Sequence, residues 1–190
     1  MENKKKKVVS VSLGSSTRNQ EVNLNLNGKN IEITRIGTDG SIKKAKEILE
    51  SLDGKVDALG LGGTDIGLMV DKKWFPLYSV HKIFKNIIKT PLVDGTGLKT
   101  LLERQAASIL SKNINKNKLL FNRKVLIISG CDRWGLQKSF IEEGYKNIYG
   151  DILFGLGIPI ILKSESQVKI LASLLLPIVS RLPFKWLYPL

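Results

Sequence analysis

Short apolar runs that end in small residues and an aspartate recur along this chain, and their ends hold the residues best suited to chemistry. Residues 56–65 run from valine through several glycines to Asp65. The length of this run favours a buried strand over a helix, and the glycines permit a tight turn. The same pattern recurs in residues 8–18, 31–40, 91–97 and 125–135.

Aspartates fall at the predicted strand ends or in the turns just after them, at Asp39, Asp65, Asp94, Asp132 and Asp151. Because the carboxyl ends of parallel strands share one edge of a sheet, we expect these turns to line a single cleft. Such carboxylates could bind Mg²⁺, or act as a general base opposite Lys99 or Arg133. In the alternative interpretation the glycines and aspartates serve only turn geometry and helix capping.

Residues 124–151 have most of a dinucleotide-binding fingerprint, which needs a strand, a G-x-G-x-x-G turn, a helix, a second strand and an acid about 20 residues on. Gly130 and Gly135 take the first and third glycine positions, and Asp151 falls where a ribose-binding acid belongs. Asp132 replaces the second glycine, at which the backbone approaches the pyrophosphate. Its carboxylate adds bulk and like charge, which a metal ion or Arg133 would have to offset.

Residues 95–100 imitate a phosphate-binding loop without matching it. The P-loop requires a lysine directly after its final glycine, whereas Leu98 separates Gly97 from Lys99 here. The weaker prediction is an anion held by amides at a helix N-terminus, with Lys99 nearby. In the alternative, Asp94 belongs to the turn and Gly97 opens the helix.

These turns supply the predicted site residues. Catalysis is assigned to Asp65, Asp94 and Lys99, and no metal ligands are assigned. The cofactor is expected to contact Gly130, Asp132, Arg133, Gly135 and Asp151. The substrate is expected to contact Gly14, Ser15, Ser16, Gly62, Gly63, Thr64, Gly95 and Thr96.

The single histidine and the single cysteine give little support for zinc or thiol chemistry. His81 cannot build a multi-histidine zinc site alone, and we expect it in the first turn of its helix. Cys131 precedes a helix, where a thiolate would be favoured, but no histidine follows it in reach of a sequence argument. One cysteine excludes an intrachain disulfide and is typical of a reducing cytosol.

Hydrophobic periodicity predicts the elements that position these residues. Alternation on both sides of Asn27 and Gly28 predicts a hairpin over residues 22–36, and residues 66–77 predict a second one. Helices are expected over residues 41–52, over a segment capped by Ser79 that extends to Ile88, and over residues 98–110.

The C-terminal part repeats the alternation of strand and helix. A strand, a helix and a second strand are expected over residues 124–129, 136–143 and 146–149. A further strand is expected over 158–162, followed by a helix that Ser164 or Ser166 caps and Pro177 interrupts.

These elements predict an α/β protein with a mostly parallel Rossmann-like sheet, decorated by β-hairpin insertions and followed by a second Rossmann-like unit. Residues 1–111 are predicted as an N-terminal α/β domain, 112–122 as a Lys/Asn-rich linker, and 123–190 as a Rossmann-like unit whose completeness is open. The apolar, aromatic end of the chain suggests the front part of a longer protein.

The net charge of +13 raises the question of a nucleic-acid partner. The basic residues are spread out and are not interleaved with aromatics as in a base-stacking groove, which disfavours nucleic acid. A small anionic metabolite or nucleotide is the predicted partner, and a homo-oligomer is left open. The longest apolar runs, 152–162 and 170–179, are too short to span a bilayer, and no secretory signal opens the chain. We therefore predict a cytoplasmic protein without membrane contact.

Several segments together resemble a bacterial family whose members carry the name quinate 5-dehydrogenase: residues 9–16, 35–40, 57–65, 93–99 and 150–159. The resemblance covers nearly the whole chain. It implies NAD(P)-dependent oxidation of quinate, an anionic cyclohexane acid, to 3-dehydroquinate. The sequence has neither the N-V-T-x-P-x-K segment nor the G-A-G-G-like turn of established quinate and shikimate dehydrogenases, so no catalytic residue is carried over from them.

Three hypotheses follow, and they leave open whether the protein is an enzyme. The first is an NAD(P)-dependent oxidoreductase acting on a small anionic hydroxy acid. The second is a non-enzymatic domain that binds a nucleotide or an anionic metabolite in the same cleft. The third is a Mg²⁺-dependent transferase that uses the strand-end aspartates.

Overall fold

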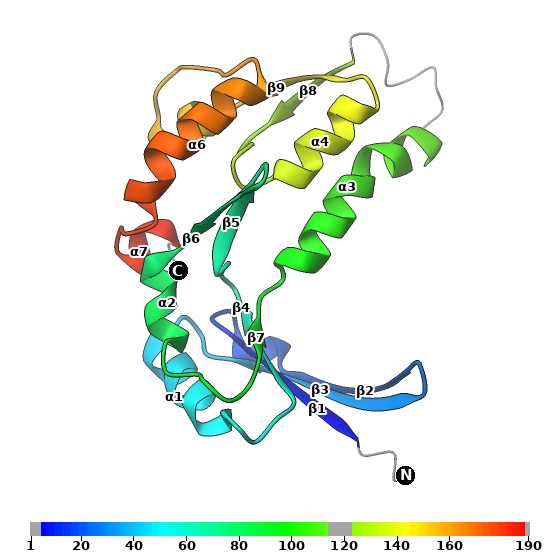
Figure 1. The fold of residues 1–190 in the computed structure, drawn as a ribbon, viewed down its shortest axis with the longest axis vertical. Helices are drawn as coiled ribbons and strands as arrows, with labels where there is room; N and C mark the ends of the chain where they lie inside the picture. Colours follow the sequence, from blue (N-terminus) through cyan, green and yellow to red (C-terminus); the bar gives the residue numbers. More distant parts are fainter. Residues whose placement is uncertain (1–4, 114–122, 189–190) are drawn as a thin grey trace. The chain divides into compact units, whose positions relative to one another are not determined.

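A computed structural model describes residues 5–113 and 123–188 and has a mixed α/β fold (Figure 1). The chain divides into two compact units. The first consists of Met1–Ile66, Pro76–Gly95 and Arg181–Leu190, and the second of Gly67–Phe75 and Thr96–Ser180. The predicted boundary at residues 111 and 112 lies in the last turn of a helix of the second unit, α3 (Thr96–Asn113). Most of the predicted linker, residues 114–122, lies outside the described residues.

The first unit is built on a five-stranded, mainly parallel sheet in the order β2-β3-β1-β4-β7. Its strands are β1 (Lys6–Ser12), β2 (Gln20–Leu26), β3 (Lys29–Gly37), β4 (Ala58–Gly62) and β7 (Leu92–Val93). β1 pairs in parallel with β3 and β4, β4 pairs in parallel with β7, and β2 pairs antiparallel with β3. The prediction of a mostly parallel sheet is therefore confirmed for this unit.

The hairpin between β2 and β3 forms where the sequence predicts it. Asn27 and Gly28 both have positive φ, 51° and 77°. A tight turn of this kind matches the twist of the two strands, and asparagine followed by glycine adopts it at low cost. Asn25 Oδ1 also accepts the Gly28 amide at 3.1 Å.

Two helices bury one face of the first sheet. Alternate residues of β1 and β4, Val9, Val11, Leu59 and Leu61, lie in a core that includes residues of α1 (Ile42–Leu52) and α2 (Tyr78–Phe84). A short 3₁₀ helix, η1 (Ser16–Arg18), follows β1. The chain returns to this core at its C-terminal end, where Phe184 of α7 (Phe184–Leu187) is buried.

The second helix of this unit differs from its prediction at both ends. α2 begins at Tyr78 and has Leu77 as its N-cap without a side-chain hydrogen bond, so Ser79 lies inside the helix and is not its cap. The helix ends at Phe84, and Ile88 is 82% exposed. The apolar pattern of the sequence extends past the end of the helix because Ile87, in the turn that follows, also packs against the core.

The second unit contains a parallel pair of strands joined by a helix. β8 (Lys124–Ile127) and β9 (Lys146–Tyr149) pair in parallel, with α4 (Trp134–Glu142) between them in the chain. The predicted strand, helix and strand are thus present. The unit also contains α3 and a separate strand pair, β5 (Gly67–Val70) and β6 (Lys73–Pro76).

The C-terminal part of this unit departs from the sequence prediction. Residues 158–162 form no strand, and Leu162 makes only an isolated bridge to Tyr149. The preceding apolar residues form α5 (Asp151–Leu156), which ends at Gly157 in the left-handed conformation. α6 (Glu165–Val179) is capped by Ser164 and continues past Pro177. Pro177 has no amide hydrogen to donate to the carbonyl four residues earlier, and the helix continues for only two residues beyond it.

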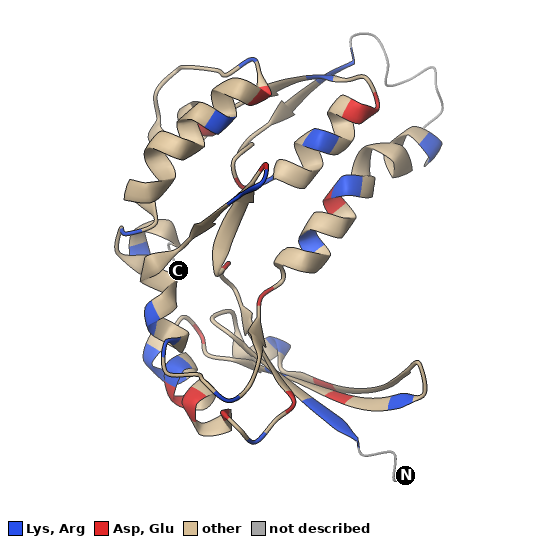
Figure 2. Cartoon of the chain, viewed as in Figure 1, with Lys and Arg blue, Asp and Glu red and all other residues tan. Residues whose placement is uncertain are grey.

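No helix in the described part of the chain combines the length and the apolar character needed to cross a membrane. Lys and Arg are spread over helices and strands of both units (Figure 2).

Candidate functional site

The predicted site residues are divided between the two units. The turns after β1, β4 and β7, with Gly14, Asp65 and Asp94, belong to the first unit, whereas Asp132 and Asp151 belong to the second. The aspartate turns therefore follow strands of two separate sheets. Each group of residues is described within its own unit.

The loops after β1, β3 and β4 meet at the carboxyl edge of the first sheet. The Thr38 amide donates to Ser12 O at 2.9 Å, and the Leu13 amide donates to Gly62 O at 2.9 Å. Gly63 has a φ of +77°, and a Cβ at this residue would lie 3.2 Å from the Gly14 amide nitrogen. Glycine is required at residue 63 because the loops after β1 and β4 touch there.

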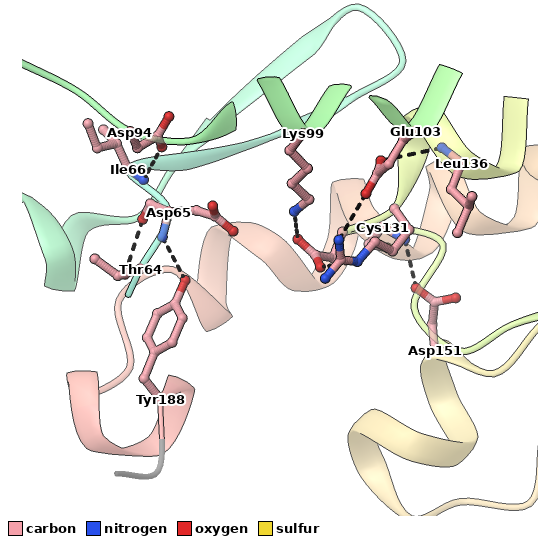
Figure 3. A network of polar contacts seen from close by, with 12 residues as sticks. Thr64, Asp65, Ile66, Asp94, Lys99, Glu103, Cys131, Leu136, Asp151 and Tyr188 are labelled. Atoms are coloured by element: carbon pink, nitrogen blue, oxygen red, sulfur yellow. Dashed lines mark hydrogen bonds and ion pairs between the residues drawn. The ribbon is translucent and has the colours of Figure 1, made fainter. Parts of the chain in front are cut away.

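Three carboxylates in the first unit have backbone partners. Asp39 Oδ1 accepts the Ser16 amide at 2.7 Å, and this hydrogen bond lowers the pKa of Asp39. Asp94 Oδ2 accepts the Ile66 amide at 2.7 Å (Figure 3). Asp53 lies elsewhere in the unit, at the C-terminal end of α1. Burial acts to raise the pKa of Asp53, but hydrogen bonds from the amides of residues 88–90 together outweigh this effect and lower it.

Asp65 and its neighbours are fixed by the C-terminal segment of the chain. The Asp65 amide donates to the Tyr188 hydroxyl at 3.1 Å (Figure 3). Thr64 is buried, and its hydroxyl lies 3.4 Å from Asp65 O. Ser15 accepts the Thr17 amide as the cap of η1, and its carbonyl accepts Arg35 Nη1 at 3.0 Å. These contacts hold the loops in place.

In the second unit, the carboxylate of Asp151 binds the turn that follows β8. It accepts the Gly130 amide at 2.8 Å. It also accepts the Cys131 amide at 2.8 Å (Figure 3). In a dinucleotide fingerprint this glycine-rich turn leads into a helix whose N-terminus holds the pyrophosphate. The amides of Gly130 and Cys131 already donate to a carboxylate, which also repels phosphate. The Asp151 carboxylate therefore disfavours a phosphate group at this turn.

The same carboxylate reverses the expectation of a favoured thiolate at Cys131. Burial raises the pKa of the Cys131 thiol, and the charges of Asp151 and Asp132 raise it further. Its Sγ lies 3.9 Å from Val168 O. Desolvation and two nearby carboxylates thus outweigh the tendency of the following helix N-terminus to lower the thiol pKa. The thiol stays protonated at neutral pH.

A chain of alternating charges links α3 to the start of α4. Lys99 Nζ lies 2.6 Å from Asp132 Oδ1, and Asp132 Oδ2 lies 3.2 Å from Arg133 Nε. Arg133 Nη1 in turn lies 2.9 Å from Glu103 Oε1. The side chains of Lys99 and Asp132 are 21% and 30% exposed, so this pair is partly screened from water.

A polar pocket of about 310 Å³ contains this ion pair. It lies within the second unit, between α3, the start of α4 and β5. Of the predicted site residues it brings together Thr96, Lys99, Asp132 and Gly135. We take this pocket as the candidate functional site, because four residues chosen from the sequence converge on it.

The close approach of two helices shapes the pocket. A Cβ at Gly135 would lie 3.1 Å from Glu103 Cβ and 3.3 Å from Thr100 O. Gly135, assigned to the cofactor from the fingerprint, thus permits α4 to pack against α3. Glu103 Oε2 also accepts the Leu136 amide at 3.3 Å, which ties the two helices together (Figure 3).

A second set of charges surrounds Trp134 in the same pocket. Lys138 Nζ lies 5.8 Å from the centre of the Trp134 ring and 2.8 Å from Glu165 Oε2. Lys169 Nζ lies 2.9 Å from Asp71 Oδ2. The hydrogen bond between these two groups lowers the pKa of Asp71 and raises that of Lys169.

Several pocket residues were not predicted: Asp71, Glu103, Arg104, Trp134 and Lys138. One signal could have found two of them. Residues 96, 99, 100, 103 and 104 recur at helical spacing, so they share one face of α3. Asp71 and Trp134 give no such signal, because only the tertiary fold brings them to this face.

Metal binding finds no support among the described residues. Residues 5–113 and 123–188 contain no group of three or more His, Cys, Asp or Glu side chains that could hold a metal ion. The carboxylates of Asp39, Asp94 and Asp151 instead accept backbone amides, and that of Asp132 pairs with cations.

Comparisons with known proteins divide the chain close to the start of α3. Residues 7–94 match a family described as Domain of unknown function (DUF8753), and residues 97–190 match one described as Domain of unknown function (DUF8754). A comparison with curated proteins finds no match. The junction of the matched segments coincides with the passage from the first unit to the second after Gly95.

Proposed function

We propose that this protein binds a small anionic hydroxy acid in the polar pocket of its second unit. The observation that carries the proposal is the alternation of charge around the pocket, where Lys99, Arg104 and Lys138 alternate with Asp132, Glu103 and Asp71. A ligand with both a carboxylate and hydroxyl groups matches this arrangement. The cations bind its carboxylate, and the acidic side chains accept hydrogen bonds from its hydroxyl groups.

The Lys99–Asp132 pair is the expected point of contact. Binding in a pocket replaces water around both side chains, and a charge-assisted hydrogen bond to a ligand is then stronger than it would be in bulk water. Asp132 accepts a ligand hydroxyl while Lys99 binds the carboxylate or a second hydroxyl. The pocket volume of about 310 Å³ suits a ligand the size of a cyclohexane acid such as quinate.

Calorimetric titration of the whole chain with quinate tests the proposal. We expect saturable binding to quinate and weaker binding to cyclohexanecarboxylate, which has the carboxylate but no hydroxyls. Lys99→Met should weaken binding about 10-fold or more, because a hydrogen bond to a charged group contributes about 1.5–3 kcal/mol. Lys112→Met is the matched control, since Lys112 lies exposed on the last turn of the same helix. Equal affinities of the two variants would refute the proposal.

A second candidate is an NAD(P)-dependent oxidoreductase, as the family resemblance implies. The parallel β8–α4–β9 arrangement supports a Rossmann-like description of the second unit. The amides of Gly130 and Cys131, however, donate to Asp151, whose carboxylate disfavours a phosphate group there. No residue is therefore assigned a role in hydride transfer. Fluorescence titration with NADH and NADPH decides: saturable binding supports this candidate, and its absence at millimolar cofactor eliminates it.

Other assignments from the sequence stay predictions. They are the cytoplasmic location, the nucleotide as alternative ligand, the homo-oligomer and the Mg²⁺-dependent transferase.

A further inference from the structure

A second cavity lies within the first unit, between α2, the start of α1 and residues 181–184. Its volume is about 520 Å³. The wall formed by the C-terminal segment is held firmly. Phe184 is buried in the first core and stacks on Tyr188, with ring centres 5.0 Å apart. Figure 1 shows α7 beside α2, and none of the residues assigned to a site from the sequence lines this cavity.

The cavity has a polar side with cationic groups. Lys82 and Arg181 line it, and among the described residues no Asp or Glu lines it. The Arg181 guanidinium lies 4.6 Å from the centre of the Tyr78 ring, and this contact positions it at the cavity. The cavity thus differs from the polar pocket of the second unit, where cations alternate with carboxylates.

One residue that lines this cavity has a buried hydroxyl without a hydrogen-bond partner among the described residues. Ser79 lines the cavity, and its Oγ has no hydrogen-bond partner in the described part of the chain. Buried hydroxyl groups without a partner are rare in folded proteins. A ligand atom in the cavity would provide the missing partner.

The remaining surface of the cavity is apolar. Ile42, Ile83, Leu182, Pro183 and Phe184 contribute to it. An apolar surface next to two cations and one hydroxyl favours a ligand with an apolar body and an anionic head.

We propose that this cavity binds a small organic anion with an apolar body and a carboxylate or phosphate head. The head group binds Lys82 and Arg181, the Ser79 hydroxyl bonds a polar atom of the ligand, and the body packs against Phe184 and Ile83. The site is independent of the hydroxy-acid pocket, because it lies in the other unit and requires an apolar body.

Calorimetric titration of the whole chain with four compounds tests this proposal. 4-Phenylbutyrate and phenyl phosphate carry the two head groups, 4-phenylbutanol has the apolar body alone, and inorganic phosphate has the charge alone. We expect one of the two amphipathic anions to bind with 1:1 stoichiometry, and the tighter one identifies the head group. The neutral alcohol and inorganic phosphate should bind about 10-fold more weakly or worse. Equal affinity for the alcohol, or no saturable binding of either anion, would overturn the proposal.

Variants connect the binding to this cavity. Lys82→Gln should weaken anion binding about 10-fold, whereas Lys85→Gln, at the C-terminal end of the same helix but outside the cavity, should not. Ser79→Ala should weaken binding and raise the Tm of the unliganded chain, because it removes the unpaired hydroxyl. Lys99→Met should leave this binding unchanged, which separates it from the proposed hydroxy-acid site. Equal effects of Lys82→Gln and Lys85→Gln would contradict the assignment.

Discussion

Asp39, Asp94 and Asp151 each accept a hydrogen bond from a backbone amide of a loop that is distant in sequence. In each case the carboxylate follows one strand and the amide belongs to the loop after another. A carboxylate that accepts hydrogen bonds from backbone amides holds a loop in place. Its charge also shifts the pKa of neighbouring groups. Asp132 differs, because its partners are the side chains of Lys99 and Arg133.

The charge of Asp151 should control the reactivity of the single cysteine. Asp151→Asn keeps a hydrogen-bond acceptor but removes the negative charge that helps raise the Cys131 pKa. The thiol pKa should fall, and alkylation by iodoacetamide at mildly alkaline pH should become faster. Because the chain has one cysteine, the rate reports on Cys131 alone.

Asp132→Asn is the matched control for this measurement. Its charge is the smallest of the causes that raise the Cys131 pKa, so its effect on the rate should be smaller than that of Asp151→Asn. Circular dichroism should show both variants folded. If the alkylation rate of Asp151→Asn equals that of the unmodified chain, the electrostatic explanation is wrong.

Asp39 should contribute stability that acid removes. Its pKa is lowered in the folded state by the Ser16 amide. A lowered folded-state pKa stabilises the protein above the ordinary Asp pKa of about 3.9, and this contribution is lost as the pH falls through the folded-state value. Urea unfolding of Asp39→Asn should therefore show lower stability than the unmodified chain at pH 7, with the difference shrinking below about pH 4. A difference that does not change with pH would count against this role.

At this scale the sequence predicts residue types better than partners. Asp39, Asp94 and Asp151 were found because aspartate follows an apolar run. Their partners were not found, because Asp94 is 28 residues from the Ile66 amide and Asp151 is 21 residues from the Gly130 amide. Only the pairing of strands and helices brings such residues together.

Individual turns depend on glycine to different degrees, and Gly63 and Gly95 form a natural comparison. Gly63→Ala should destabilise the protein by about 1–3 kcal/mol, because alanine is strained at positive φ and its Cβ would crowd the Gly14 amide. Gly95→Ala should change stability by less than about 0.5 kcal/mol, since a Cβ there meets nothing within 4 Å. Thermal or urea unfolding measures both. Similar losses for the two variants would show that backbone conformation at residue 63 is not the cause.

Elements whose conformation depends on residues close together in the sequence were predicted well. Elements whose ends or pairing depend on tertiary packing were not. The β2–β3 hairpin follows from Asn27 and Gly28, whose conformations depend on the turn itself. The start of α2 does not follow from Ser79, because the helix begins one residue earlier without a side-chain cap. Residues 158–162 have the composition of a strand, yet only Leu162 finds a bridge partner.

The first core depends on a residue near the C-terminal end of the chain. Phe184→Ala should destabilise the first unit by about 3–5 kcal/mol, because it removes a buried aromatic ring from the core of Val9, Leu59 and Val80. Hydrogen exchange should show lost protection in β1, β4 and α2. Trp186→Ala is the control: Trp186 is 74% exposed, and its loss should cost less than about 0.5 kcal/mol. Equal losses would show that Phe184 contributes little to the core.

At the scale of the whole molecule, the sequence predicted α/β architecture and a division into two parts. Alternating strands and helices were sufficient for the class. The packing of Phe184 and Tyr188 against the first core was left open by the sequence, because an apolar end of the chain does not indicate which core it joins.

The chain passes between its two units four times, after residues 66, 75, 95 and 180. A gene cut after residue 95, where the two matched families meet, would leave the first product without Phe184 and Tyr188. The second product would lack Val70 and Phe75, which belong to its own core. The two matched segments and the two compact units therefore have different boundaries, and each product of such a cut would lack core residues that lie in the other.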